Sequence, residues 1–227
     1  MNDYSETPQI TRYLERLSPA EQERLRYLLN DLRLCKPSGG RFRFLDMGAG
    51  SGTMSAGVLF LFKNAEGTLV DIQDHFAFPK ETSEIWSKYI RFVAWKDLAN
   101  IRDDKFDLVI STDVLEHIID WRKAFSRLCG YCAIGGYLYI QVPSNYPSPN
   151  YPRSRLLKQR ALGMLGFNDP STHVRHGISC KQLFDEAIKN GLVPLRAAED
   201  YVVDSKVYCA FKPRCHCLFQ KQQKPCT

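Results

Sequence analysis

From Arg41 onwards, the chain alternates short apolar runs with segments whose apolar residues recur at helical spacing. The runs read RFRFLDMG, GTLVDI, IRFVAW, FDLVI and GGYLYIQVP, at 41–48, 67–72, 90–95, 106–110 and 135–143. Strands that alternate with helices favour a parallel sheet with helices on both faces, and right-handed crossovers make such a sheet doubly wound. The pattern therefore predicts an α/β fold.

The two ends of the chain depart from this alternation. Residues 1–38 read as an N-terminal helical cap, in which Ser18, Pro19 and Glu21 form a capping-box helix start. The runs at 192–203 and 207–213 predict a C-terminal antiparallel strand pair. We place the main domain at 39–213, with a lid or substrate insertion at 144–176, and expect a flexible cysteine-containing tail at 214–227.

Charge and hydropathy restrict the classes of protein. The chain has 227 residues and a formal net charge of +6, which permits an anionic ligand but argues for none. It contains no dense basic stripe, so a nucleic-acid partner is not favoured. No apolar run approaches the roughly 20 residues of a membrane helix. The polar, acid-containing N-terminus does not resemble a targeting peptide, and we expect a cytoplasmic protein.

The eight cysteines fall into two groups. The first group lies singly in predicted elements, and for these we expect buried free thiols. Its members are Cys35, Cys129, Cys132, Cys180 and Cys209. The second group, Cys215, Cys217 and Cys226, lies with His216 in the expected tail, where a soft metal is the alternative to a flexible segment.

Residues 45–53, LDMGAGSGT, form a glycine-rich loop between a predicted strand and a helical segment. Glycines permit positive φ, and the following helix N-terminus offers unpaired N–H groups. Asp71 ends the next strand, where a carboxylate can accept both ribose hydroxyls. These features predict a nucleotide-like ligand; a glycine-rich turn without a ligand is the alternative.

Two residues argue against a dinucleotide at this loop. The dinucleotide pattern has a third glycine where this chain has Thr53. A carboxylate at Asp46 would repel a pyrophosphate but suits an ammonium group. The loop therefore favours a cofactor that carries a nucleoside at one end and an amino acid at the other.

The ordered segments FLDMGAGSG, LVDI, WKDLANI, FDLVISTDVLEHIIDWRKAFSRL and GGYLYIQVPS resemble the motifs of class I S-adenosylmethionine-dependent methyltransferases. The resemblance extends from about Arg41 to about Pro213. It implies a Rossmann-like, doubly wound, mostly parallel seven-stranded sheet with a C-terminal antiparallel strand pair and N-terminal helices. It also implies a set of cofactor-binding residues: Asp46, Gly48, Ala49, Gly50, Gly52, Asp71, Ile72, Asp97, Leu98, Ser111 and Thr112.

The stretch STDVLEHIID follows the fourth predicted strand. If a helix starts near Val114, then Asp113, Glu116 and His117 lie at i, i+3 and i+4 on one face, which would make a divalent-metal half-site for Mg, Mn or Zn. The motif with a distant His173 resembles two branches of the family, the ubiquinone-biosynthesis O-methyltransferases and the small-RNA 2′-hydroxyl methyltransferases. In the metal-free alternative, His117, Glu116 and His173 are the candidate catalytic residues.

The sequence therefore predicts a methyltransferase that uses S-adenosyl-L-methionine and methylates an oxygen of a small-molecule acceptor. One alternative is metal-assisted methylation of a catechol or an RNA 2′-hydroxyl. Another is a non-catalytic protein that keeps the cofactor-binding fold. The sequence does not indicate the acceptor or the oligomeric state.

Overall fold

The computed structural model describes residues 15–37, 40–72, 89–143, 177–203 and 211–223, together with the isolated positions 157 and 161. Within these ranges, the side chains of 198–203 and 211–213 are not described. The predicted insertion at 144–176 lies outside these ranges except for positions 157 and 161, and so do His173 and Cys209.

The elements follow the alternation that the sequence predicts. The helices are α2 (Pro19–Leu32), α3 (Thr53–Leu61), α5 (Trp121–Tyr131) and α7 (Cys180–Lys189), with 3-10 turns η2 (Trp95–Ile101) and η3 (Leu115–His117). The strands are β1 (Phe42–Met47), β2 (Ala65–Asp71), β3 (Ile90–Ala94), β4 (Phe106–Thr112), β5 (Cys132–Pro143), β6 (Leu192–Val203) and β7 (Phe211–Lys221).

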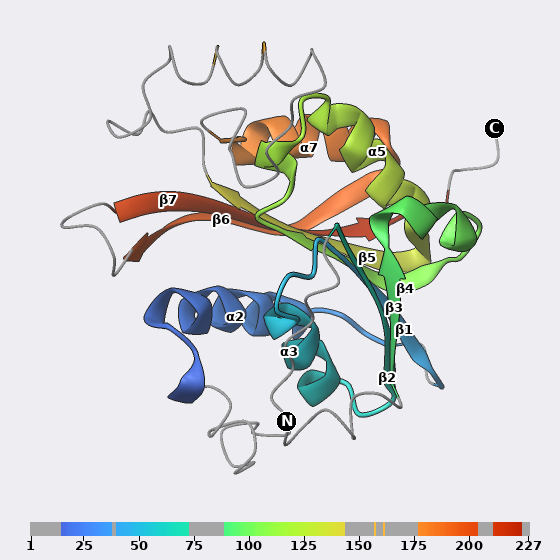
Figure 1. Ribbon diagram of the computed structural model, residues 1–227. Helices are drawn as coiled ribbons and strands as arrows, with labels where there is room; N and C mark the ends of the chain where they lie inside the picture. The colour runs from blue at the N-terminus through green and yellow to red at the C-terminus, as the bar shows by residue number, and fades with distance from the viewer. Residues whose placement is uncertain are drawn as a thin grey trace.

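The strands form one seven-stranded sheet in the order β3-β2-β1-β4-β5-β7-β6. β1 to β5 pair in parallel, and β7 runs antiparallel to both of its neighbours. In Figure 1, α2 and α3 cover one face of the sheet, and α5 and α7 cover the other. The predicted fold class, a mostly parallel α/β sheet with a C-terminal antiparallel pair, is confirmed.

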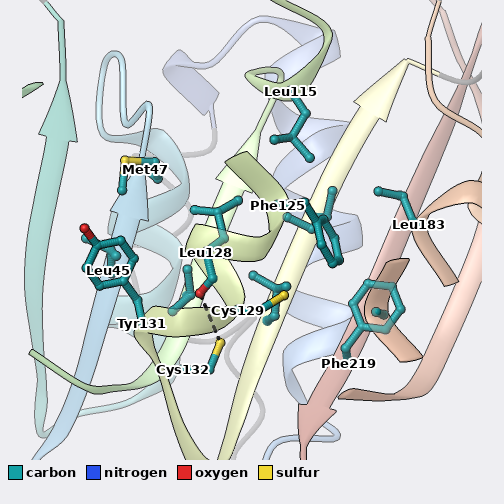
Figure 2. Close-up of a cluster of buried hydrophobic side chains, with 14 of the residues drawn as sticks. Leu45, Met47, Leu115, Phe125, Leu128, Cys129, Tyr131, Cys132, Leu183 and Phe219 are labelled. Carbon is teal, nitrogen blue, oxygen red and sulfur yellow. Dashed lines mark hydrogen bonds between the residues drawn. The ribbon is translucent and has the colours of Figure 1, made fainter. Parts of the chain in front are cut away.

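Each face of the sheet has its own apolar core. Alternate residues of one strand enter different cores: Leu45 packs with α5 and α7, whereas Phe44 packs with α2 and α3. Figure 2 shows the first core, which contains Phe125 and Leu128 of α5 and Leu183 of α7. Burial on both faces explains why the central strands read as nearly continuous apolar runs.

Local capping fixes where two of the helices begin. The Ser18 hydroxyl accepts a hydrogen bond from the Glu21 amide (3.3 Å), and the Glu21 carboxylate accepts one from the Ser18 amide (3.0 Å). Ser179 and Gln182 make the same reciprocal pair at α7. The predicted helix start at Ser18 is confirmed. None of the helices in the described ranges is long and apolar enough to cross a membrane.

The prediction of a flexible tail at 214–227 is wrong, because the strand β7 extends from Phe211 to Lys221 instead of ending near Pro213. Its central residues alternate between the two cores: Cys215, Cys217 and Phe219 enter one, and Leu218 enters the other. His216 is also buried, since Asp31 lies 2.7 Å from its Nδ1. The sequence did not predict this buried strand, because the polar residue His216 lies between Cys215 and Cys217.

The cysteine predictions are confirmed in part. Cys35, Cys129 and Cys132 are buried thiols. Cys180 is not a free thiol, because it forms a disulfide with Cys215 across 35 residues of sequence. Nothing in the spacing of these two cysteines indicates the pairing, which depends on α7 packing against β7.

A methyl group added at Gly67 should destabilise the sheet. Gly67 pairs with Phe44 across β1 and β2, and a Cβ there would lie 2.4 Å from the Phe44 ring, which is completely buried. We expect Gly67→Ala to lower the free energy of unfolding by about 1–3 kcal/mol in urea titration. Gly130→Ala is the matched control, since its Cβ meets nothing within 4 Å and alanine favours the α5 helix. Equal stability of the two variants would contradict this packing.

Candidate functional site

The glycine loop between β1 and α3 is held against two other strands. Gly48, Gly50 and Gly52 all have positive φ, at 81°, 52° and 76°. The amides of Gly48 and Ala49 donate to the Val70 carbonyl of β2, at 2.8 and 3.1 Å. A Cβ at Gly48 would lie 2.2 Å from Cγ2 of Val114, which follows β4. The loop therefore needs glycine both for its backbone conformation and for this close approach.

Asp46 lies directly beneath this loop, near the end of β1, and is 1% exposed. Its Oδ2 accepts a hydrogen bond of 2.6 Å from the Ser55 hydroxyl of α3. Its Oδ1 is buried without a hydrogen-bond partner. Burial raises the pKa of the Asp46 carboxyl from 3.8 to about 7, and the Ser55 hydrogen bond opposes only part of this rise. A buried, half-satisfied carboxyl is an unusual feature that a cationic ligand would complete.

Asp71, at the end of β2, already contacts the loop. Its Oδ2 accepts a 2.8 Å hydrogen bond from the Gly50 amide, and its Oδ1 accepts a 2.7 Å bond from the Ile72 amide. A carboxylate oxygen can accept more than one hydrogen bond, so holding the loop does not by itself prevent Asp71 from accepting hydroxyl donors. Ile72 beside it is 55% exposed, which leaves an apolar surface next to the carboxylate.

The remaining predicted cofactor residues follow the next two strands. Asp97 is exposed and Leu98 is half-buried, both in η2 after β3. Ser111 is 1% exposed, with its hydroxyl buried and unpartnered, and Thr112 ends β4. Because the carboxyl ends of parallel strands share one edge of a sheet, the fold brings these residues to the same edge as Asp46 and Asp71. Their contacts with a cofactor remain predictions.

Asp113 has a role that the sequence did not indicate. It is the one non-glycine residue with positive φ (56°) in the described ranges. Its Oδ2 accepts from Arg24 of α2 at 2.6 Å, and its Oδ1 accepts from Arg214 of β7. All three side chains are largely buried, with exposures between 12% and 26%. Arg24 and Arg214 are 89 and 101 residues away from Asp113, so no local signal could have found this cluster.

The predicted helix from Val114 is wrong. Residues Leu115–His117 form a 3-10 turn, and α5 begins only at Trp121, where Asp120 caps the Lys123 amide. The turn does not continue into α5, because Ile118, which follows His117, has an extended backbone (φ −99°, ψ 124°). Asp113, Glu116 and His117 therefore do not share a helical face.

Glu116 and His117 nevertheless lie together beside the end of β4. Glu116 is completely buried, the His117 side chain is 22% exposed, and His117 Nε2 lies 3.9 Å from Glu116 Oε1. Both carboxylate oxygens of Asp113 accept hydrogen bonds from arginines. This arrangement counts against the predicted role of Asp113 as a metal ligand. His173 lies outside the described residues, so the catalytic roles of Glu116, His117 and His173 stay predictions.

A second buried polar cluster lies between α2 and β7. Asp31 is completely buried, and it faces His216 Nδ1 at 2.7 Å and Arg196 Nε at 2.9 Å. Tyr27 stacks on the His216 ring with centroids 4.6 Å apart. Gln141 of β5, which pairs with His216, is completely buried, and its amide has no hydrogen-bond partner. Sequence reasoning missed this cluster because its members come from four elements that are far apart in the sequence.

The buried Asp46 carboxyl should make the unliganded protein less stable as the pH rises. Its pKa in the folded chain is about 7 against 3.8 in the ordinary state, so the folded protein binds a proton more tightly than the unfolded chain. The stabilisation that comes from this tighter proton binding at Asp46 is fully present below about pH 4 and is lost as the pH rises through 7. Relative to wild type, Asp46→Asn should gain up to about 4 kcal/mol of stability between pH 4 and pH 8.

Urea unfolding of both proteins at several pH values measures this difference. Because other groups titrate equally in both proteins, only the difference between them reports Asp46. A difference that stays constant from pH 4 to pH 8 would show that the carboxyl titrates normally.

Comparison with known proteins agrees with the fold. A putative sarcosine dimethylglycine methyltransferase from Galdieria sulphuraria superposes with a TM-score of 0.61 at 16% identity, covering 91% of each chain. The N-methyltransferase NodS from Bradyrhizobium japonicum WM9, solved with S-adenosyl-L-homocysteine, superposes with a TM-score of 0.59 at 18% identity. The match covers 92% of this chain and 90% of that one.

Magnesium protoporphyrin IX methyltransferase from Synechocystis PCC 6803 gives a TM-score of 0.57 at 18% identity, covering 89% and 84% of the two chains. At these identities the likeness concerns the fold alone. A search of curated protein sequences finds no significant match.

The family model described as "Methyltransferase domain" matches residues 6–192, which is most of the chain. This match includes the glycine loop, the acid at the end of β2 and the segment after β4. The protein therefore belongs to the methyltransferase-domain family and is a methyltransferase with a Rossmann-like fold.

Proposed function

We propose that the protein transfers a methyl group from S-adenosyl-L-methionine to an oxygen atom of a small-molecule acceptor. The observation that carries the choice of cofactor is the unpartnered, buried Oδ1 of Asp46 beneath the glycine loop. An ammonium group would satisfy this oxygen, whereas a pyrophosphate would be repelled by it. The fold likeness to NodS, which was solved with S-adenosyl-L-homocysteine, supports the same cofactor.

The residues at the edge of the sheet fit the three parts of this cofactor. Asp46 with the loop of Gly48, Ala49, Gly50 and Gly52 would hold the amino-acid part. Asp71 would accept the ribose hydroxyls while still holding the Gly50 amide. The other contacts would come from Ile72, Asp97 and Leu98 on the nucleoside side and from Ser111 and Thr112 near the sulfur.

Replacing the Asp71 carboxylate should weaken cofactor binding without unfolding the loop. Asparagine keeps one acceptor oxygen but loses the charge, and charge-assisted hydrogen bonds contribute about 1.5–3 kcal/mol. We expect Asp71→Asn to raise the Kd for S-adenosyl-L-methionine by roughly 10- to 100-fold in isothermal calorimetry. Asp185→Asn, on the exposed face of α7, is the matched control and should bind as wild type does.

Two results would oppose the proposed cofactor. One is a wild-type chain that takes up neither S-adenosyl-L-methionine nor its demethylated product. The other is equal affinity of the Asp71→Asn and Asp185→Asn variants. Binding of a nicotinamide dinucleotide instead would assign the loop to a different chemistry.

The chemistry requires a group that removes a proton from the acceptor hydroxyl. Bound cofactor supplies an electrophilic methyl group on a sulfonium. The acceptor oxygen attacks the methyl carbon, the carbon–sulfur bond breaks, and its electron pair stays with sulfur. His117 would take the hydroxyl proton, because its imidazole is partly exposed beside the end of β4 and Glu116 lies next to it, with 3.9 Å between His117 Nε2 and Glu116 Oε1.

His117→Asn should therefore slow transfer to a hydroxyl acceptor. General bases typically contribute about 10²–10⁴-fold, so we expect kcat to fall within that range while the Kd for S-adenosyl-L-methionine stays unchanged. The assay uses labelled methyl transfer to a panel of phenols, alcohols, carboxylates and amines. With a phenol acceptor the defect should shrink at high pH, because the acceptor then ionises by itself. Unchanged kcat in the variant would remove His117 from the mechanism.

The metal-assisted alternative has less support, since Asp113 is engaged by Arg24 and Arg214. It makes a separate prediction, that a chelator abolishes activity and that Mg²⁺, Mn²⁺ or Zn²⁺ restores it. Full activity in chelator agrees with the metal-free mechanism proposed here.

A further inference from the structure

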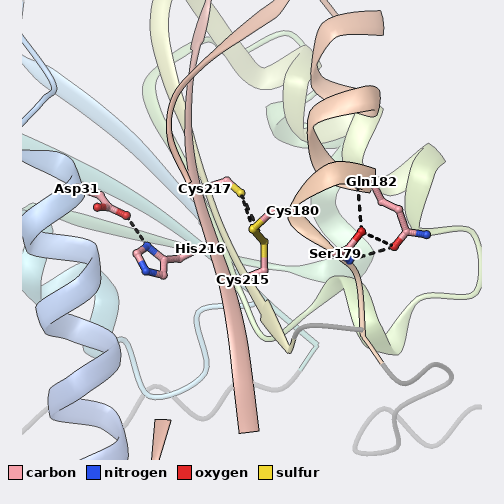
Figure 3. The surroundings of a disulfide bond; sticks show 7 residues. All are labelled: Asp31, Ser179, Cys180, Gln182, Cys215, His216 and Cys217. Carbon is pink, nitrogen blue, oxygen red and sulfur yellow. Dashed lines mark hydrogen bonds and ion pairs between the residues drawn. A yellow bond between two sulfur atoms is a disulfide. The ribbon is translucent and has the colours of Figure 1, made fainter. Parts of the chain in front are cut away.

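Three cysteine sulfurs meet between α7 and β7, near the carboxyl end of β5, where Cys215 pairs with Val142. Cys180 is the first residue of α7, and Cys215 and Cys217 lie two residues apart on β7. Figure 3 shows these three sulfurs on one side of β7, with His216 and Asp31 on the other side. The Cys217 sulfur is 3.6 Å from that of Cys215 and 3.8 Å from that of Cys180.

We call Cys180, Cys215 and Cys217 the thiol trio. Their positions are determined by the helix α7 and the strand β7. Alternation along β7 sends Cys215 and Cys217 to the α7 side and the intervening His216 to the α2 side. The reciprocal cap of Ser179 and Gln182 fixes the first turn of α7, and therefore the position of Cys180. The disulfide links Cys180 to Cys215, so the position of Cys217 beside both sulfurs is not required by the disulfide.

We propose that the reduced thiol trio binds one thiophilic d¹⁰ metal ion, Zn²⁺ or Cu⁺. It is the one group of three potential metal ligands within 4.8 Å of one another in the described part of the chain. Thiolates are the ligands that select these soft ions. Metal–sulfur bonds of about 2.3 Å place the sulfurs of a tetrahedral site about 3.8 Å apart. The two sulfur–sulfur separations that involve Cys217 already match that spacing.

The surroundings of the trio fit a bound ion better than three separate thiolates. Cys215 and Cys217 are completely buried in the apolar core beside α7, where an uncompensated thiolate would be costly. A divalent ion with three thiolates leaves one net negative charge, and the N-terminus of α7 at Cys180 favours negative charge. Cys180 is only partly buried, so an ion has a route to the site and water can complete its coordination.

Metal binding and the disulfide exclude each other. A dithiol or phosphine reductant supplies the two electrons that break the Cys180–Cys215 bond, and two protons complete the two thiols. The ion then displaces the thiol protons, which leave to solvent, and it binds the resulting thiolates. The trio would therefore hold a metal ion in the reduced chain and a disulfide in the oxidised chain.

The experiment uses the full chain, reduced with a phosphine and desalted without oxygen, beside an oxidised sample. Native mass spectrometry counts bound ions in two arms, one with Zn²⁺ and one with Cu⁺. Competition with a chromogenic chelator specific for each ion gives the affinity and tells which ion the site prefers. We expect one ion per reduced chain and none per oxidised chain.

Two alanine variants make the test specific. Cys217→Ala should weaken binding by more than the roughly 10- to 100-fold that loss of an outer-shell partner costs. Cys129→Ala is the matched control, since Cys129 is an equally buried thiol of the same core whose pKa burial raises to about 12. It should bind the ion as wild type does.

A measurement on the wild-type chain removes any dependence on how the variants fold. Bound metal should protect Cys180, Cys215 and Cys217 from alkylation, as read by peptide mass spectrometry, and leave the labelling of Cys35 unchanged. The proposal is overturned if the reduced chain binds neither ion, if Cys217→Ala binds as tightly as Cys129→Ala, or if metal protects none of the three cysteines.

Discussion

The ion-pair cluster of Asp113 with Arg24 and Arg214 connects the parts of the molecule that surround the methyltransferase site. Asp113 follows β4, Arg24 belongs to the N-terminal helix α2, and Arg214 belongs to the last strand β7. The positive φ of Asp113 is uncommon for a non-glycine residue, and the two ion pairs together with the hydrogen bond from the Asp113 amide to the Gln141 carbonyl support it. The residue after Asp113, Val114, packs closely against Gly48. The turn at Asp113 therefore contacts both the two arginines and the glycine loop.

Asp46 shows how a binding feature can conflict with stability. Its buried carboxyl has one satisfied oxygen and one unsatisfied oxygen, and burial raises its pKa towards neutrality. In an unliganded chain this arrangement is unfavourable above pH 7. Under the proposed function, the ammonium group of the cofactor pairs with the buried Asp46 carboxylate. Burial of this carboxylate lowers the stability of the unliganded chain, and the pairing removes that cost when the cofactor binds. Asp71, by contrast, already accepts a hydrogen bond from the Gly50 amide of the loop.

Predictions from local sequence succeeded where local physics decides the structure. The capping box at Ser18 is short-range, and the strands β1 to β5 carry apolar runs that are typical of a sheet buried on both faces. The same reasoning was wrong at two places. A helix from Val114 does not form, because the turn ends at the extended residue Ile118. The last strand β7 was taken for a tail because the partner of its polar residue His216 is Asp31, 185 positions away in the sequence.

The sequence by itself determined the alternation of strands and helices, the glycine loop and the order of the methyltransferase motifs, since each depends on residues close together in the chain. Only the tertiary structure decided which side chains meet: Asp113 with two arginines, His216 with Asp31, and three cysteines between α7 and β7. These contacts join residues 35 to 185 positions apart, and they form because packing both faces of one sheet brings α2, α7 and β7 against its central strands.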